Sequence, residues 1–288
     1  MKNDRESLKL DKKIDLNFWK DVEEKYACKI EHRDVKVSVV VPTYNSAVFL
    51  GSLLYDIASQ NYDNYEVIVI DASSTDRTLE VAYRSQCNVR VYSVANYNYY
   101  EMVNRGISLA RGDYIQFLKP EDSILSIAMF SHFVRSVHKD GYPDFISSAS
   151  LNYSDGRGCD FVAENFNLES LQRGEAAINF SACWFKKDIF RLVGRFDTSF
   201  YLRADYDIFC KLFLNSSTKV SVLRRVFVDV QKVELSHSFV ASYYVESLKV
   251  LKLHFGLRWA AWWFFHQRFV SVFFDIWRQK LIKYFTAR

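Results

Sequence analysis

The sequence predicts an α/β fold, and three observations support this prediction. Two short apolar runs rich in β-branched residues, Val37–Val41 and Glu66–Ile70, are typical of parallel strands covered on both faces. Apolar residues recur at helical spacing between them, and Ser46 stands where an N-cap is expected. Strand-length and helix-length patterns then alternate up to about residue 118. A strand, a helix and a second strand in this order form a βαβ unit, which indicates a parallel sheet.

The remaining elements follow from the same patterns. We expect strands at 89–92, 114–118, 144–153, 179–185 and 219–231. We expect helices at 78–82, 102–110, 124–137 and 186–193, and another that begins near Asp205. Gly112 is expected to close the helix at 102–110. A hairpin turn is expected at 155–157, and a loop over the weakly patterned residues 158–178.

Composition limits the class of protein. The chain has 288 residues, 49% of them apolar, and a net charge of +4, which is too small to indicate nucleic-acid binding. Its five cysteines form no C-x-x-C, which favours free thiols over a disulfide framework or a zinc site. The charged N-terminus has no apolar core of a signal peptide. G-x-G-x-x-G and P-loop motifs are absent, which argues against dinucleotide enzymes and P-loop kinases.

Polar residues follow both of the first strands. Pro42-Thr43-Tyr44-Asn45 comes after the first run, and Asp71-Ala72-Ser73-Ser74 comes after the second. In open α/β sheets, ligands bind at the carboxyl edge of the strands. A carboxylate at a strand end, such as that of Asp71, is a poor core group but a good acceptor for a ribose hydroxyl or a base N–H. The alternative is that these are ordinary turn residues.

This stretch resembles the opening of the family 2 glycosyltransferases, which have the GT-A fold. In that family, P-x-Y-N and D-x-x-S-T-D hold the nucleotide of a sugar donor. The resemblance implies a Rossmann-like domain that binds a nucleotide-diphosphate sugar, with a UDP-sugar favoured. It assigns nucleotide binding to Pro42, Thr43, Tyr44, Asn45, Asp71 and Ser73.

The resemblance continues through residues 102–118. Met102 to Ile115 is similar to the family pattern M-N-x-G-I-x-x-A-x-G-D-Y-I. Asn104 and Arg105 match the position that faces the donor. Spacing alone favours the alternative, in which Asn104 is an amide on a helix surface.

The end of the 114–118 strand departs from the family pattern. It reads Lys119-Pro120-Glu121-Asp122, where the family has an acidic D-x-D-type motif. The resemblance implies that Glu121 and Asp122 hold Mg²⁺ or Mn²⁺, which offsets the charge of the leaving diphosphate. Lys119 is an alternative, because its ammonium group can contact the diphosphate directly. Without the resemblance, Pro120, Glu121 and Asp122 also fit the first turn of a helix.

A further similar segment runs from Gly194 to Leu212 and matches G-x-F-D…E-D-Y-D-L. It implies that Asp205 is the general base, which takes the proton of the acceptor on the face opposite the leaving group. Ala204 replaces the frequent Glu of the family, and Phe180-Ser181 replaces a His-Gln pair. The alternative is that Asp205 and Asp207 only stabilise the first turn of their helix.

The C-terminal 40 residues change in character. Eight basic residues face a single acid, Asp275, and four of the six tryptophans lie here. From residue 268 the pattern predicts an amphipathic helix, and basic residues with Trp and Phe fit the interface of an anionic membrane. Charge-free runs are too short to span a bilayer. The alternative is a helix that packs its aromatic side chains on its own domain.

These observations predict three parts. Residues 1–34 form an arm with nine basic and nine acidic side chains, 35–230 form the GT-A domain, and 231–288 form a helical, membrane-associating tail. We expect inverting transfer of one sugar to a lipid-linked or cell-surface glycan acceptor, at the cytoplasmic face of a membrane. The absence of a Q-x-x-R-W motif argues against a processive synthase. A degenerate GT-A module that binds a nucleotide-sugar or a protein without turnover is the alternative; a sugar nucleotidyltransferase is disfavoured, since no Gly-rich loop follows the first strand.

Overall fold

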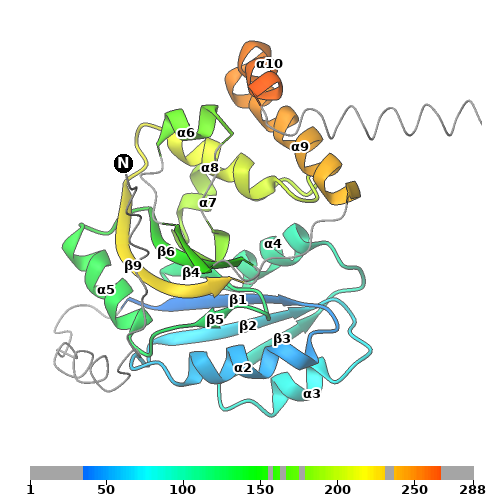
Figure 1. Ribbon diagram of the computed structural model, residues 1–288. Helices are drawn as coiled ribbons and strands as arrows, with labels where there is room; N and C mark the ends of the chain where they lie inside the picture. The colour runs from blue at the N-terminus through cyan, green and yellow to red at the C-terminus, as the bar shows by residue number, and fades with distance from the viewer. Residues whose placement is uncertain (1–34, 155–157, 163–166, 175–178, 231–236, 267–288) are drawn as a thin grey trace, which may run out of the picture. The chain divides into compact units, whose positions relative to one another are not determined.

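The computed structural model describes residues 35–154, 158–162, 167–174, 179–230 and 237–266. Within these residues, nine strands form one mixed sheet in the order β3-β2-β1-β4-β8-β6-β9-β5, with β7 paired to β6 (Figure 1). The strands are β1 (Val37–Thr43), β2 (Tyr65–Asp71), β3 (Val89–Ser93), β4 (Tyr114–Phe117), β5 (Ser123–Ile124), β6 (Phe145–Ser154), β7 (Gly158–Val162), β8 (Cys183–Lys186) and β9 (Val220–Val230). The helices are α2 (Ala47–Ala58), α3 (Thr78–Tyr83), α4 (Tyr99–Leu109), α5 (Met129–Lys139), α6 (Leu168–Gln172), α7 (Ile189–Leu192), α8 (Ala204–Leu214), α9 (His237–Phe255) and α10 (Leu257–His266).

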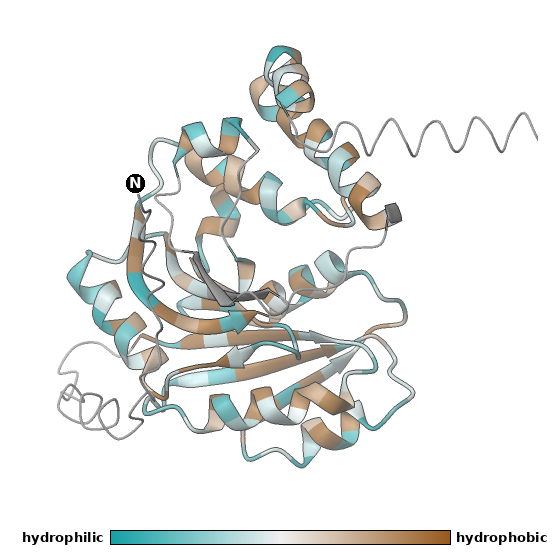
Figure 2. Cartoon of the chain, in the orientation of Figure 1, coloured by the Kyte–Doolittle hydropathy of each residue, from teal (hydrophilic) through white to brown (hydrophobic). Residues whose placement is uncertain are grey.

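The first half of the sheet is parallel, as the sequence predicts. β1 pairs in parallel with both β2 and β4, and β2 pairs in parallel with β3. Every residue of β1 is buried, which explains why its sequence is a continuous apolar run rather than an alternating one. Figure 2 shows these central strands as mostly hydrophobic. The carboxyl ends of four strands therefore meet at one edge of the sheet, where the polar motifs lie.

Two glycines allow α4 and the chain after it to approach β1 closely. A Cβ atom on Gly106 would lie 2.2 Å from a methyl group of Val40, so only glycine fits where α4 crosses β1. A Cβ on Gly112 would lie 2.7 Å from the carbonyl oxygen of Lys36. The prediction that Gly112 closes the helix is wrong: α4 ends at Leu109, and Gly112 instead serves this close contact with β1.

The second half of the sheet is antiparallel around β8 and is filled with aromatic side chains. β8 pairs antiparallel with β4 and with β6. The ring of Phe117, at the end of β4, stacks on Phe180 with a centroid distance of 5.1 Å and meets Phe196 edge-on at 5.9 Å. Such offset and edge-on contacts stabilise aromatic pairs beyond their buried area. The aromatic cluster thus fixes the segments that follow β4 and precede α8.

Three expected segments differ in the structure. The helix expected at 124–137 begins only at Met129, because Ser123 and Ile124 form β5 and pair with β9. Pro120 and Glu121 form a turn closed by the Asp122 N–H, which donates to the Lys119 carbonyl, so the helix-start interpretation of this segment is wrong. The strand expected at 179–185 begins at Cys183, after a 3₁₀ helix over Phe180–Ala182. The expected loop at 158–178 contains β7 and α6.

Two helices follow β9. Residues of α9 contact α8 through an ion pair of His254 with Asp207 at 2.7 Å, and Trp263 of α10 lies 5.4 Å from the ring of Tyr244 in α9. Among the described residues, no helix is long and apolar enough to cross a membrane. The arm at 1–34, the turn at 155–157 and the amphipathic helix expected from residue 268 lie outside the described residues.

Candidate active site

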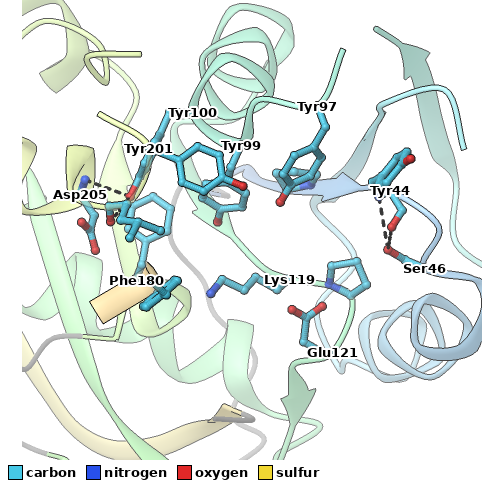
Figure 3. Close-up of a pocket in the computed structure, with 14 residues that line it drawn as sticks. Tyr44, Ser46, Tyr97, Tyr99, Tyr100, Lys119, Glu121, Phe180, Tyr201 and Asp205 are labelled. Atoms are coloured by element: carbon cyan, nitrogen blue, oxygen red, sulfur yellow. Dashed lines mark hydrogen bonds between the residues drawn. The ribbon is translucent and has the colours of Figure 1, made fainter. Parts of the chain in front are cut away.

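A cleft of about 450 Å³ opens at the carboxyl edge of the parallel strands (Figure 3). The end of β1, the segment after β4, and the first turns of α4 and α8 with the residues before them all contribute to it. It contains five residues that the sequence assigned to the site: Pro42, Tyr44, Lys119, Glu121 and Asp205. The other lining residues are Ser46, Tyr97, Tyr99, Tyr100, Pro120, Phe180, Tyr201, Leu202 and Phe239.

The loops after β1 and β2 are joined to each other by hydrogen bonds. The Asn45 N–H donates to Ser74 Oγ at 2.8 Å, and the Asn45 side-chain oxygen accepts from the Thr75 N–H at 2.9 Å. The Ser46 N–H donates to Thr78 Oγ1 at 2.7 Å. Asn45 and Ser73 have positive φ angles of 47° and 54°, a conformation that costs free energy in residues other than glycine. Strained backbone held by such contacts is typical of binding loops.

The side chain of Asp71 holds the loops after β1 and β2 together. Its side chain is 0% exposed, and it accepts hydrogen bonds from Thr43 Oγ1 at 3.0 Å, Ser74 Oγ at 2.6 Å and the Ser74 N–H at 2.9 Å. The carboxylate therefore does not line the cleft, although the resemblance implies a direct contact with the nucleoside. Thr43, Asn45 and Ser73 likewise lie outside the cleft lining and stabilise the loops that carry Tyr44.

We expect Asp71→Ala to weaken nucleotide binding, because the β1 and β2 loops lose the carboxylate that holds them together. Hydrogen bonds to a charged group contribute about 1.5–3 kcal/mol each, and we expect a loss of binding energy in that range. Calorimetric titration with a nucleoside diphosphate measures the loss. Asp63→Ala, at an exposed position before β2, is the control that should bind normally. Unchanged affinity in Asp71→Ala would refute this role.

Four tyrosines form a wall of the cleft that the sequence analysis missed. Tyr97 lies 5.6 Å from the ring of Tyr44, and Tyr99 and Tyr100 begin α4, which Asn98 caps by accepting from two backbone N–H groups. Burial raises the pKa of Tyr99 and Tyr100 well above the usual value, so both hydroxyls keep their protons. The Tyr99 hydroxyl is buried and has no hydrogen-bond partner within the described residues. Tyr201 completes the group from the segment before α8, and the run Y-N-Y-Y at 97–100 was the available signal.

Tyr100 connects this wall to Asp205. Its hydroxyl donates to the Leu202 carbonyl at 3.0 Å and accepts from the Asp205 N–H at 3.4 Å. Asp205 lies in the first turn of α8, and its Oδ1 accepts from the Tyr206 N–H at 2.7 Å. Asp207 lies outside the cleft and is buried. Its burial alone would raise the pKa of its carboxyl, but hydrogen bonds from His254 and Lys211 outweigh this and lower that pKa. The two acids of this segment thus differ: Asp205 faces the cleft, and Asp207 joins α8 to α9.

The charged side chains of residues 119–122 lie in different surroundings. Lys119 extends along the cleft toward the side of Asp205, whereas Glu121 points into it (Figure 3). Lys119 makes no ion pair with any described residue. Asp122 is only 2% exposed, its Oδ2 accepts from the Lys119 N–H at 2.7 Å, and burial raises the pKa of its carboxyl to about 6. Asp122 therefore shapes the turn rather than lining the cleft.

These positions decide which residues fit a divalent cation. No group of three His, Cys, Asp or Glu side chains suited to a metal occurs among the described residues. Mg²⁺ is often held by one or two carboxylates together with substrate phosphates, and Glu121 fits as one such carboxylate. Asp122, with one oxygen used by the turn and its side chain buried, is not placed to reach a ligand in the cleft.

Two further expected residues lie elsewhere. The Asn104 amide donates to the Phe196 carbonyl at 2.8 Å, and its oxygen accepts from the Phe196 N–H at 3.1 Å. Asn104 therefore joins α4 to the segment before α8. Its amide is neither directed at a donor in the cleft nor free on the surface of the helix. Arg105 is exposed on α4, outside the cleft lining.

Comparisons with known proteins agree with this fold. Residues 38–165 match the family model of glycosyl transferase family 2. Glycosyltransferase GlyG of Streptococcus pneumoniae serotype 4 is 31% identical over 224 residues, which cover 66% of this chain and 74% of GlyG. A PGL/p-HBAD biosynthesis glycosyltransferase of Mycobacterium bovis is 27% identical over 187 residues, which cover 62% of this chain and 70% of that protein.

Solved structures share the fold. The crystal structure of residues 1–349 of S. aureus TarS in complex with UDP aligns with a TM-score of 0.59 at 20% identity, over 76% of this chain and 65% of that chain. The mannosyltransferase PcManGT from Pyrobaculum calidifontis, in complex with GDP-Man and Mn²⁺, aligns with a TM-score of 0.56 at 15% identity, over 86% of this chain and 80% of that chain. Fold and sequence together define a glycosyltransferase with the GT-A fold. The chain belongs to glycosyl transferase family 2.

Proposed function

We propose that the protein transfers one sugar from a nucleotide-diphosphate sugar to an acceptor hydroxyl, with inversion at the anomeric carbon. The observation that carries this proposal is the arrangement of charges in one cleft. Lys119 and Glu121 follow β4, whereas Asp205 begins α8 and lines the same cleft from another wall (Figure 3). A cation and a cation-binding carboxylate suit a diphosphate, and a separate carboxylate suits an acceptor proton.

The proposed step is a single displacement. Asp205 accepts the proton of the acceptor hydroxyl while the acceptor oxygen forms a bond to the anomeric carbon. The bond from that carbon to the diphosphate oxygen breaks on the opposite face, and its electron pair leaves with the nucleoside diphosphate. Attack from the face opposite the leaving group inverts the configuration. Lys119 lies where it can stabilise the leaving charge, and a divalent cation held by Glu121 would supply further charge compensation there.

The donor side of the cleft favours a nucleotide. Tyr44 and Tyr97 present two rings 5.6 Å apart beside Pro42, which provides an apolar and aromatic surface for a base. A second structure of the S. aureus TarS neighbour contains UDP-GlcNAc, and the mannosyltransferase neighbour contains GDP-Man. These neighbours support a nucleotide-sugar donor, and we favour a UDP-sugar.

A donor screen by thermal shift tests this proposal, with and without Mn²⁺. A nucleoside diphosphate that binds only the folded protein, at a concentration 100 times its dissociation constant, stabilises it by about 2.7 kcal/mol. We expect one nucleoside diphosphate to raise the melting temperature more than the others. Stabilisation by none of them would contradict the assignment of the cleft.

We propose that the acceptor is lipid-linked or a cell-surface glycan, reached from the cytoplasmic face of a membrane. Helices α9 and α10 present an apolar groove whose lining includes Val245, Leu248, Phe264 and Phe265, with Lys249 and Lys252 among the same residues. Leu257 is 68% exposed and Phe265 is 75% exposed. Exposed apolar side chains beside lysines fit the surface of an anionic membrane.

We expect the double substitution Leu257→Ser and Phe265→Ser to reduce binding to anionic liposomes at least tenfold, because each buried apolar side chain contributes about 1.5–3 kcal/mol. The control replaces Leu192 on α7 and Tyr83 on α3, which are both exposed, with Ser. This control protein should bind the liposomes normally. Added salt should weaken binding by the unmodified protein, since its lysines are screened. Equal sedimentation of all three proteins with liposomes would reject the membrane contact.

A further inference from the structure

The loop before α8 is held by a carboxylate that lies far away in the sequence. Glu246, in the middle of α9, accepts hydrogen bonds from three consecutive backbone N–H groups. Its Oε1 accepts from Tyr201 at 3.0 Å, and its Oε2 accepts from Leu202 at 2.8 Å and from Arg203 at 3.0 Å. Its side chain is 9% exposed. A buried carboxylate satisfied by three aligned backbone donors fixes the conformation of all three residues.

This contact lies directly before the first turn of α8. Arg203 stands at the N-cap of α8, and its own side chain makes no capping hydrogen bond. Glu246 places a negative charge at the N-terminal end of α8, where the helix dipole favours one. The three residues it holds are directly followed by Ala204 and then Asp205, and two of them, Tyr201 and Leu202, line the cleft themselves.

One face of α9 contacts α8 and the loop before it. Tyr243, Glu246, Val250 and His254 recur at helical spacing and share this face. The Arg203 guanidinium lies 4.4 Å from the ring centroids of both Tyr206 and Tyr243, and His254 pairs with Asp207. Glu246 is the member of this face that bonds to the backbone next to Asp205. Tyr243 and His254 contact the side chains of Arg203 and Asp207 instead.

We propose that Glu246 is a positioning residue for the transfer reaction: it fixes Tyr201–Arg203 and, through them, orients Asp205 toward the acceptor. This inference rests on the proposed function of Asp205. Reaction rates depend steeply on such geometry, and a misplacement of about 1 Å costs on the order of 100-fold in rate. Pro42 and Tyr44, on the donor side, come from β1 and the loop after it, and no hydrogen bond links them to Glu246. Loss of Glu246 therefore acts on turnover and not on donor binding.

The test compares Glu246→Ala, Glu246→Gln and His254→Gln in the full chain. We expect Glu246→Ala to lower kcat about 10- to 100-fold while the KM for the donor stays within about twofold. Glu246→Gln, which keeps the size and one acceptor oxygen, should lie between Glu246→Ala and the unmodified protein. His254→Gln loses a contact of α9 with α8 but none with 201–203. Its kcat should stay within about threefold of that of the unmodified protein, even if it unfolds at a lower urea concentration.

Hydrogen exchange at the amides of 201–203 provides a readout that does not depend on activity. We expect faster exchange there in Glu246→Ala than in His254→Gln, because only the first variant removes the acceptor of these N–H groups. Unchanged exchange, or faster exchange with an unchanged kcat, would overturn the positioning role. A drop in kcat as large in His254→Gln as in Glu246→Ala would also overturn it, since general loosening of α9 would then explain both. If the unmodified protein transfers no sugar, the proposed function fails, and the exchange data still decide whether Glu246 holds the loop.

Discussion

Replacing Asp205 with asparagine is expected to abolish most sugar transfer while leaving donor affinity nearly unchanged. Asparagine keeps the shape of the side chain but cannot accept the proton of the acceptor hydroxyl. A general base typically contributes 10²–10⁴-fold in rate, or roughly 3–5 kcal/mol of activation free energy. Asp205 lines the cleft from α8, whereas Pro42 and Tyr44 line it from β1 and the loop that follows, so nucleotide binding should survive the change.

Asp207→Asn is the matched control, because it makes the same substitution two residues further along α8. Asp207 is buried and pairs with His254 at 2.7 Å and with Lys211 at 2.6 Å, so its loss removes contacts between charged groups and lowers stability. The control should lower the urea midpoint and retain transfer in the folded protein. Initial rates at saturating donor, with calorimetry for donor affinity, separate the two effects. Full transfer by Asp205→Asn would show that the alignment through Arg203–Asp207 is wrong.

The sequence predicted the parallel half of the fold because the relevant information there is local. β1 and β2 are continuous apolar runs, and the segment between them has helical spacing, so their pairing follows from the βαβ rule. The motifs at their ends lie where parallel strands must bring them. What the motifs could not reveal is how each residue is used. Asp71 is enclosed by Thr43 and Ser74, because a buried carboxylate takes the nearest donors, and those belong to its own loops.

The rest of the site depends on contacts that no local pattern encodes. Ile124 looked like the start of a helix, but pairing with Val228 across the sheet decides its conformation. Asn104 looked like a ligand contact by resemblance, but the backbone of Phe196 takes its amide. Glu246 lies in a stretch that composition assigned to a membrane tail, yet its partners are 43 to 45 residues earlier in the chain. Tertiary contacts override local patterns in all three cases.

The charge balance around the diphosphate decides between two ways of stabilising the leaving group. The structure offers Lys119 as a cation within the cleft and Glu121 as a ligand for one. A lysine stabilises a phosphate as a point charge, whereas a divalent cation supplies twice that charge but needs a carboxylate to hold it. The two uses differ in what a chelator does, which makes them separable by experiment.

We expect activity to fall when the protein is titrated with EDTA and to return when Mn²⁺ or Mg²⁺ is added, because a cation held by Glu121 would offset the charge of the leaving diphosphate. Glu121→Gln should lower donor affinity only when metal is present, since the lost carboxylate acts only through the cation. Lys119→Ala should lower donor affinity with and without metal by about 1.5–3 kcal/mol, or roughly 10- to 150-fold, because we expect its ammonium group to bind the phosphates without a cation between them. Donor titrations of the unmodified protein, Glu121→Gln and Lys119→Ala, each in EDTA and in Mn²⁺, measure these affinities. If activity instead survives EDTA and Lys119→Ala is the more damaging change, Lys119 replaces the cation, and the assignment of Glu121 to a metal site is wrong.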